Sequence, residues 1–319
     1  MKILILGGSG FVGGHLARRL SQDGHKLTIA TRYAPGCRHL GVVPGVTIRQ
    51  FDPYDSEELA RQMDGHDAAI NLVGILNERV AGGGKGFRRA HVELVETLIN
   101  TCVRTGTRRF IHMSALNAGQ GESQYLKTRG EAENMVDEVF RQGTLDTTVM
   151  RPSTIFGPDD SFLNRFASLL KIAPVLPLAR PRARFAPVYV GDVVEAFARV
   201  LERRESFGKT HELCGGEEWA LIDLVRWLRD QLGLKRAVVG LPDALGRMQG
   251  LAFDIVPGKP FSSDNYKSLL LDSVCAENAF GELGIEPWAM SDLAPTWLGD
   301  RTRQQRYQRY RRQARRDKE

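Results

Sequence analysis

The sequence predicts an α/β protein with a doubly wound parallel sheet and a small mixed C-terminal lobe. Two observations carry this prediction. Short apolar runs typical of buried strands alternate with amphipathic helical periodicity through the first half of the chain. This strand–helix order requires parallel strands joined by right-handed crossovers. In addition, a glycine-rich run separates the first apolar run from the first helical pattern.

That glycine run, Gly7-Gly8-Ser9-Gly10-Phe11-Val12-Gly13, follows a predicted strand at 2–6 and precedes a predicted helix that includes 15–20. The first glycine permits a tight turn, the second lets the backbone approach a pyrophosphate, and the third lets the helix pack close to the strand. Free N–H groups at the helix start favour an anion. The run therefore predicts a Rossmann dinucleotide site, and the alternative is a turn that serves only the fold. The residues expected at the cofactor are Gly7, Ser9, Gly10, Phe11, Val12 and Gly13.

The other elements follow in order along the chain. Further strands are predicted at 26–31, 46–51, 67–73, 109–113 and 146–150, and helices at 56–63, 87–104 and 125–140. In the second half we expect a strand at 187–192 that ends at Asp192 as the N-cap of a helix at 193–201, and further helices at 219–232 and 242–255. We divide the chain into a nucleotide-binding core at 1–155, the remaining core elements and C-terminal lobe at 156–299, and a basic tail at 300–319.

Ligands of such sheets lie outside the carboxyl ends of the strands. Arg32 follows the second strand, where an acidic residue would bind the ribose hydroxyls of NAD. A guanidinium there suits a 2′-phosphate, so we expect NADP(H) to be preferred, with NAD(H) possible. The alternative is an exposed surface arginine. Asp52 follows the third strand and is expected to face the adenine.

Three further strand ends complete the predicted cofactor site. Leu72, Val73 and Gly74 end the fourth strand, and the small residue permits close approach of the backbone. Ser114 ends the fifth strand, and Pro152 follows the sixth.

The composition argues against membrane, secreted and metal-binding proteins. No apolar run reaches the roughly 18 residues of a membrane span, and the first strand leaves no room for a signal peptide, so we expect a cytoplasmic protein. The four cysteines lie far apart, without a CxxC pair, and we expect reduced thiols with packing roles. The seven histidines show no metal-ligand spacing, so no metal is predicted.

The basic charge is concentrated in the tail. Residues 301–319 hold nine Lys and Arg and two Asp and Glu, a charge of +7, so the rest of the chain sums to −1. A near-neutral body argues against a nucleic-acid-binding face. The tail is either a solvated terminus or a contact with an anionic membrane surface or acidic partner, and RNA is the weakest alternative.

Together these motifs resemble the extended, atypical short-chain dehydrogenase/reductase superfamily, whose members include NAD-dependent epimerases and dehydratases. The segments 151–157 and 188–192 match its pattern. Shorter segments at 71–74, 114–117, 174–178 and 241–245 resemble the branch that contains the NAD(P)H-binding accessory subunit of respiratory complex I, alpha-subcomplex subunit 9. The resemblance covers about residues 2 to 299 and implies a nicotinamide dinucleotide site below a C-terminal lobe.

Active members of the superfamily use Tyr-x-x-x-Lys with a Ser or Thr from the loop after the fifth strand. The tyrosine transfers a proton, and the lysine holds the nicotinamide ribose. Here the pair is Tyr125 and Arg129, and Lys127 stands about 200° away around the helix. Arginine does not replace lysine conservatively at such a site. Ser114 is the nearest candidate for the hydroxyl partner.

Three functions therefore remain open. The first is an NADP(H)-binding protein with redox-linked chemistry or none, associated by resemblance with quinone or respiratory metabolism. The second is an active reductase, epimerase or dehydratase that uses Tyr125 with Arg129. The third is a non-catalytic accessory subunit or assembly factor that uses the nucleotide for stability.

Overall fold

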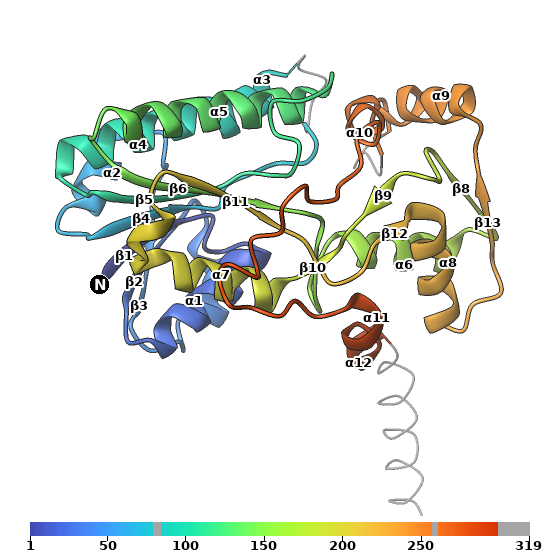
Figure 1. Ribbon diagram of the computed structural model, residues 1–319, viewed down its shortest axis with the longest axis horizontal. Helices are drawn as coiled ribbons and strands as arrows, with labels where there is room; N and C mark the ends of the chain where they lie inside the picture. Colours follow the sequence, from blue (N-terminus) through green and yellow to red (C-terminus); the bar gives the residue numbers. More distant parts are fainter. Residues whose placement is uncertain (79–83, 257–260, 299–319) are drawn as a thin grey trace, which may run out of the picture.

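The structure is a computed structural model that describes residues 1–78, 84–256 and 261–298 (Figure 1). The predicted basic tail at 300–319 lies outside these residues. The N-terminal part is a sheet of seven parallel strands in the order β11-β6-β5-β4-β1-β2-β3. The strands are β1 Lys2–Leu6, β2 Lys26–Thr31, β3 Val46–Gln50, β4 Ala68–Asn71, β5 Arg109–Met113, β6 Asp146–Pro152 and β11 Lys209–Leu213. This confirms the predicted fold class.

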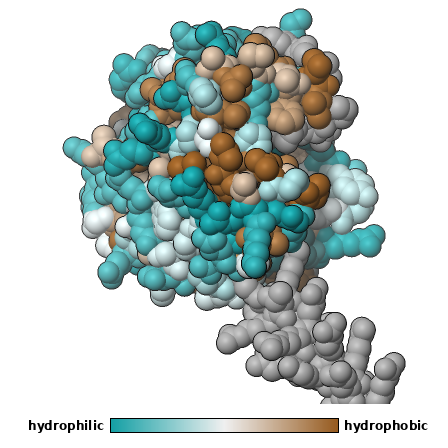
Figure 2. All heavy atoms as spheres, turned by 90° about the vertical axis from the view of Figure 1, so that its right-hand side faces the viewer, coloured by the Kyte–Doolittle hydropathy of each residue, from teal (hydrophilic) through white to brown (hydrophobic). Residues whose placement is uncertain are grey.

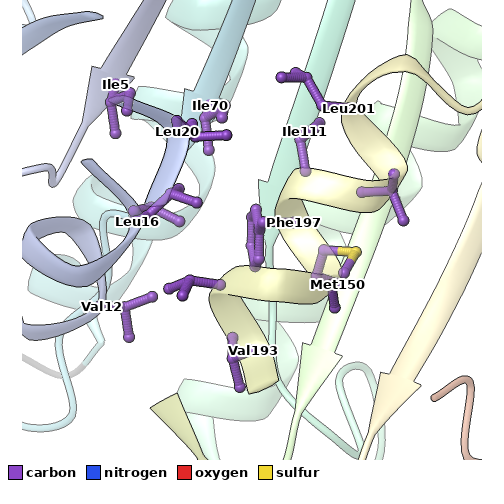
Figure 3. Close-up of a cluster of buried hydrophobic side chains, with 14 of the residues drawn as sticks. Ile5, Val12, Leu16, Leu20, Ile70, Ile111, Met150, Val193, Phe197 and Leu201 are labelled. Atoms are coloured by element: carbon purple, nitrogen blue, oxygen red, sulfur yellow. The ribbon is translucent and has the colours of Figure 1, made fainter. Parts of the chain in front are cut away.

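Helices cover both faces of this sheet (Figure 1). One face is covered by α1 Phe11–Gln22 and α7 Val190–Glu202, and the other by α2 Ser56–Met63, α4 Leu94–Thr105 and α5 Gln124–Arg141. The strand order reverses between β1 and β4, which is where doubly wound sheets bind ligands. On the first face, apolar residues from the helices meet those of the strands in one core (Figure 3). It includes Ile5, Leu16, Ile70, Ile111, Val193 and Phe197.

The C-terminal lobe is built from short elements around a separate apolar core. Its strands form three two-stranded sheets, β7 Ile155–Phe156 with β10 Val188–Tyr189, β9 Arg184–Phe185 with β12 Trp219–Ala220, and β8 Val175–Leu178 with β13 Ala237–Gly240. Its helices are α6 Phe162–Ile172, α8 Leu221–Gln231, α9 Asp243–Phe253, α10 Ser263–Ser268, α11 Met290–Leu293 and α12 Pro295–Leu298.

Three predicted elements differ in detail. The strand expected at 187–192 is limited to β10, because the helix that follows it already begins at Val190. The helix expected at 87–104 is divided into α3 Lys85–Arg88, a π-helical turn at Arg89–Glu93, and α4. The prediction that Asp192 caps α7 is wrong, because the helix begins at Val190 with Tyr189 as its N-cap. Val190 is buried in the core between α7 and the sheet, so the helix starts earlier, and Asp192 instead accepts a hydrogen bond from the Trp288 N–H at 2.8 Å.

The expectation of four reduced thiols is also wrong. Cys37 and Cys102 are free and buried, whereas Cys214 and Cys275 form a disulfide. These two residues are 61 positions apart in the sequence, but the end of β11 and the segment after α10 run together, with their Cα atoms 5.9 Å apart. The disulfide thereby ties this segment to the edge strand of the main sheet.

Across the three described ranges, none of the helices combines the length and apolarity needed to cross a bilayer. In the same ranges, no group of three or more His, Cys, Asp and Glu side chains is arranged to hold a metal ion.

Candidate functional site

The turn between β1 and α1 has the backbone geometry of an anion site. Gly7 has a φ of +76°, and a Cβ on it would lie 2.9 Å from the carbonyl carbon of Leu72. A Cβ on Gly13 would lie 2.4 Å from the Cα of Gly8, so only glycine lets α1 approach the turn this closely. Gly10 is the N-cap of α1 and supplies no side chain to cap it. The first N–H groups of α1 are therefore left for an anionic ligand.

The remaining residues of the glycine run surround this turn. Ser9 is exposed, Val12 is buried in the core beneath the helix, and Phe11 is half-buried, with its ring beside Gly157. The structure therefore brings the predicted pyrophosphate residues together at one helix start.

Arg32 and Asp52 follow β2 and β3, and both side chains are exposed. Arg32 forms no ion pair with any residue in the described part of the chain. The Tyr54 N–H donates to the Asp52 carboxylate at 3.2 Å, and the guanidinium carbon of Arg89 is 4.5 Å from the centroid of the Tyr54 ring. Burial raises the pKa of Tyr54, and the positive charges of Arg89 and Arg32 oppose this rise. Two cations thus influence Tyr54, and the sequence had indicated only Arg32.

At the end of β4, Gly74 makes room for a side chain of this protein. A Cβ on Gly74 would lie 1.9 Å from Nη2 of Arg129, so any other residue would displace that guanidinium. Arg129 donates from Nη1 to the carbonyl of Met113 at 2.9 Å and to that of Val73 at 3.4 Å. Its side chain therefore joins the ends of β4 and β5.

Tyr125 and Arg129 lie side by side on α5. The guanidinium carbon of Arg129 is 5.5 Å from the centroid of the Tyr125 ring. Arg129 is buried, Tyr125 is half-buried and Lys127 is exposed, as expected for a residue on the far side of the helix. Within the described residues the Tyr125 hydroxyl has no hydrogen-bond partner, and its ring packs edge-on against His91, with 5.5 Å between ring centroids.

The start of α5 is held by α10. Ser123 caps α5, accepting a hydrogen bond from the Leu126 N–H at 3.3 Å. The Asp264 carboxylate accepts hydrogen bonds from the Ser123 hydroxyl at 2.9 Å and from the Tyr125 N–H at 3.1 Å. The lobe therefore fixes the turn of helix that carries Tyr125.

A buried polar layer beneath this pair was missed by sequence reasoning. His91 accepts a hydrogen bond from the Ile75 N–H at Nε2 (3.2 Å) and lies 2.9 Å from the Thr128 hydroxyl at Nδ1. His112 lies in β5, and its Nδ1 is 3.2 Å from the amide nitrogen of Asn71. Burial, with the nearby Arg129 charge, lowers the pKa of His91 to about 2 and that of His112 to about 3. A histidine inside an apolar strand was the available signal.

Three buried polar atoms at this end of the sheet have no partner among the described residues. They are Nε of Arg129, the hydroxyl of Ser114 and Nε2 of His112. Buried polar atoms are normally hydrogen-bonded, so unpaired ones at the carboxyl ends of parallel strands suit a polar ligand. Pro152 ends β6 nearby, and its carbonyl accepts the Leu116 N–H at 3.3 Å, beside the loop that follows Ser114. The carboxyl edge of the sheet thus has an anion-binding turn after β1 and unpaired polar atoms at the ends of β4 and β5. This arrangement fits a dinucleotide.

Comparison with known proteins agrees with this geometry. The sequence profile of the NAD dependent epimerase/dehydratase family matches residues 3–214. A rat protein, NADH dehydrogenase [ubiquinone] 1 alpha subcomplex subunit 9, mitochondrial, is 26% identical over 293 residues, which cover 89% of this chain and 76% of the relative. A ceramide reductase from Caulobacter vibrioides is 28% identical over 250 residues, which cover 76% of this chain and 74% of that protein.

Among solved structures, a dTDP-glucose 4,6-dehydratase double mutant from Streptomyces venezuelae with NAD bound superposes with a TM-score of 0.75. The two sequences are 20% identical, and the match covers 93% of this chain and 96% of the dehydratase. The resemblance inferred from the motifs is therefore confirmed, both for the superfamily and for the complex I branch.

Proposed function

Because this chain belongs to the NAD dependent epimerase/dehydratase family, we propose that it binds a nicotinamide dinucleotide, with NADP(H) preferred over NAD(H). The observation that carries the proposal is the β1–α1 turn, where Gly7 and Gly13 leave no room for a Cβ and α1 starts without a side-chain cap. Such a helix start is a site for a pyrophosphate.

In this proposal the residues fall into three groups along the carboxyl edge of the sheet. Gly7, Ser9, Gly10, Phe11, Val12 and Gly13 hold the pyrophosphate. Arg32 pairs with the 2′-phosphate, Arg89 adds charge there and Asp52 lies at the adenine. Leu72, Val73, Gly74, Ser114, Tyr125, Arg129 and Pro152 surround the nicotinamide half.

We further propose that the chemistry of this site is redox-linked or absent, as in an accessory subunit or assembly factor of a respiratory or quinone-linked system. The similarity to the complex I subunit supports that setting. The position of Arg129 supports the proposal that the site carries out little or no proton-transfer chemistry. The guanidinium is occupied by two backbone carbonyls and remains charged, so it cannot act as a small, mobile ammonium group.

An active reductase, epimerase or dehydratase is the second candidate, and one observation favours it. The Tyr125 hydroxyl is unpaired within the described residues and stands beside a fixed positive charge. A bound nicotinamide would supply hydride transfer, and the phenolic oxygen of Tyr125 would donate the proton in a reduction and accept it in an oxidation. Ser114, whose hydroxyl has no partner among the described residues, would orient the substrate oxygen. The similarity to a ceramide reductase is consistent with this candidate.

The decisive experiment releases small molecules from the purified protein by denaturation and identifies them by mass spectrometry. Recovery of NADP(H) supports the proposal, and stoichiometric retention without turnover of candidate carbonyl substrates favours the accessory role. Consumption of NADPH with such a substrate favours the enzyme. Failure to recover or rebind any nicotinamide dinucleotide would contradict both candidates.

A further inference from the structure

Helix α9 presents its large apolar residues to solvent and its glycines to the protein. Only Gly246 and Gly250 are buried, packed against Ala179 and Ser263. On the opposite side, Leu245, Met248 and Leu251 are 49%, 63% and 60% exposed. Their spacing of three residues places them along one stripe of the helix. Helices of globular proteins normally bury such a stripe.

The two-stranded sheet of β8 and β13, beside α9, also exposes apolar side chains to solvent. Leu176, Leu178 and Val238 point into the lobe core, whereas the opposite face carries only apolar residues, all of them exposed. These are Val175, Pro177, Ala237 and Val239. The two surfaces adjoin, because Gln249 of α9 donates a hydrogen bond to the carbonyl of Pro177 at 3.2 Å. Ile172, 82% exposed, stands at the near end of α6.

We define the apolar lobe face as Ile172, Val175, Pro177, Ala237, Val239, Leu245, Met248 and Leu251. Figure 1 places its elements at the end of the molecule away from the main sheet, and Figure 2, which looks onto that end, shows hydrophobic residues gathered there. A contiguous apolar surface of this kind marks an interaction site.

The charges around this face indicate what it contacts. In residues 161–183 and 221–256, nine Lys and Arg stand against four Asp and Glu, a charge of +5, so the other residues up to 300 sum to −6. Lys171, Lys235 and Arg247 are exposed and form no ion pair within the described ranges. Arg236 lies beside Lys171, donating to the carbonyl of Leu170 at 3.2 Å. The lobe segments that carry the apolar residues therefore have a net positive charge, whereas the rest of the body is net negative.

From this combination we infer that the apolar lobe face docks on an anionic lipid bilayer. Exposed Leu, Met and Val side chains enter the region between headgroups and acyl chains, while Lys and Arg extend to the lipid phosphates. A second copy of the chain fits poorly, because symmetric packing of this face would bring two regions of +5 together. The contact is separate from the nucleotide site and does not depend on the proposed function.

The first test measures binding of the full chain to vesicles of phosphatidylcholine with and without phosphatidylglycerol. The variant Leu245→Ser/Met248→Ser/Leu251→Ser should bind anionic vesicles about 10- to 100-fold more weakly than the parent, because it buries less apolar surface in the bilayer. The matched control is Val42→Ser/Val103→Ser, which changes residues 84% and 47% exposed on the nucleotide-binding core and should bind like the parent. All three proteins should retain the same nucleotide affinity.

A second variant tests the charges. Lys171→Gln/Lys235→Gln/Arg247→Gln should lower binding to phosphatidylglycerol vesicles about tenfold or more at low salt, with the difference reduced at high salt.

A third measurement locates the contact. Tryptophan fluorescence in Met248→Trp should gain quenching by vesicles with brominated acyl chains, and Val42→Trp should not. The proposal is overturned if the apolar variant binds like the parent or if Met248→Trp is not quenched. It is also overturned if the parent does not bind vesicles and instead forms dimers that are absent in the apolar variant.

Discussion

Arg129 and Gly74 form a matched pair at the centre of the candidate site. The guanidinium occupies the space that a side chain at position 74 would need, and it is held by the carbonyls of Met113 and Val73. Its Nε is left without a partner among the described residues. The positive charge is therefore fixed in position.

Tyr125 and Arg129 separate the two candidate functions. If the protein is an enzyme, Tyr125→Phe should abolish turnover and leave cofactor binding within a few-fold, because only the proton-transfer group is lost. Arg129→Lys should raise turnover, since an ammonium group would be free of one or both carbonyls. Steady-state kinetics on both variants, with calorimetry for cofactor affinity, measures this. Full activity in Tyr125→Phe would show that another group transfers the proton.

Arg32 should determine the choice of cofactor. No acid competes at the end of β2, so we expect NADPH to bind about 10- to 150-fold more tightly than NADH. This ratio corresponds to the roughly 1.5–3 kcal/mol that a charge-assisted pair between Arg32 and the 2′-phosphate contributes. Arg32→Asp should reverse the order. Titration calorimetry with both nucleotides measures this, and equal affinities in the parent protein would contradict it. Arg89→Gln, which removes the neighbouring cation and keeps Arg32, should give a smaller loss of NADPH affinity.

At the scale of elements, His91 joins three parts of the site. It lies in the π-helical turn before α4 and contacts the loop after β4 through Ile75 and helix α5 through Thr128. Such turns are frequent at functional sites. Since Nε2 accepts a hydrogen bond, this nitrogen must be unprotonated, in agreement with the lowered pKa.

This pKa predicts a dependence of stability on pH. The folded pKa of His91, about 2, lies below the value of about 6.5 in the unfolded chain, so below pH 6.5 the unfolded state binds the additional proton. The unfolding free energy should therefore fall by about 1.4 kcal/mol per pH unit for this residue between about pH 6 and 4. The variant His91→Gln should have a lower unfolding free energy at pH 7, and that free energy should fall less than the parent's as the pH is lowered.

Urea unfolding at several pH values measures the difference, and His39→Gln, a change at an exposed histidine, is the control. An identical pH slope in the parent and His91→Gln would show that His91 is not held neutral.

The sequence predicted the elements with strong periodicity and missed those set by tertiary contacts. The first six strands of the main sheet were predicted close to their observed bounds because each contains a short apolar run, and in the edge strand β3 the partly buried Val46 and Ile48 alternate with exposed residues. Strand β11 was missed because Leu213 is its only aliphatic residue, while Lys209, Thr210 and Glu212 reach solvent. Of the lobe strands, only β10 was predicted, within the strand expected at 187–192. The others were missed because two to four residues are too few to show a periodicity.

The same limit applies to the candidate site. Glycines, strand ends and the Tyr125–Arg129 spacing are local signals, so they were visible in the sequence. The contacts of His91 with Ile75 and Thr128, the disulfide between Cys214 and Cys275, and the contact of Asp264 with the start of α5 join distant segments. Their partners are decided by the packing of the sheet and lobe, which no local pattern specifies.

At the scale of the whole molecule, charge is distributed unevenly. Residues 301–319 carry +7, and the remaining chain sums to −1, of which the lobe segments around the apolar lobe face contribute +5. Two stretches of the sequence therefore carry a net positive charge, and they differ in composition. The lobe region combines charge with apolar side chains, whereas the tail sequence offers charge with few apolar residues.

We propose that the tail adds a salt-sensitive attraction to an anionic membrane surface or acidic partner. Each basic residue near an anionic bilayer contributes about 1 kcal/mol, and screening limits the attraction to about 10 Å at 0.1 M salt. A chain ending at Asp300 should therefore bind phosphatidylglycerol vesicles more weakly at low salt and nearly equally at high salt. Its NADPH affinity should not change, because the tail lies beyond the family match at 3–214.

Vesicle sedimentation over a salt series separates the two regions. The difference between the full and shortened chains should vanish as salt rises, whereas the loss caused by Leu245→Ser/Met248→Ser/Leu251→Ser should persist, because burial of apolar area is not screened. Addition of poly-glutamate should compete with the tail component and leave the apolar component in place. If the full and shortened chains sediment equally at low salt, the tail does not contact the membrane and is a solvated terminus.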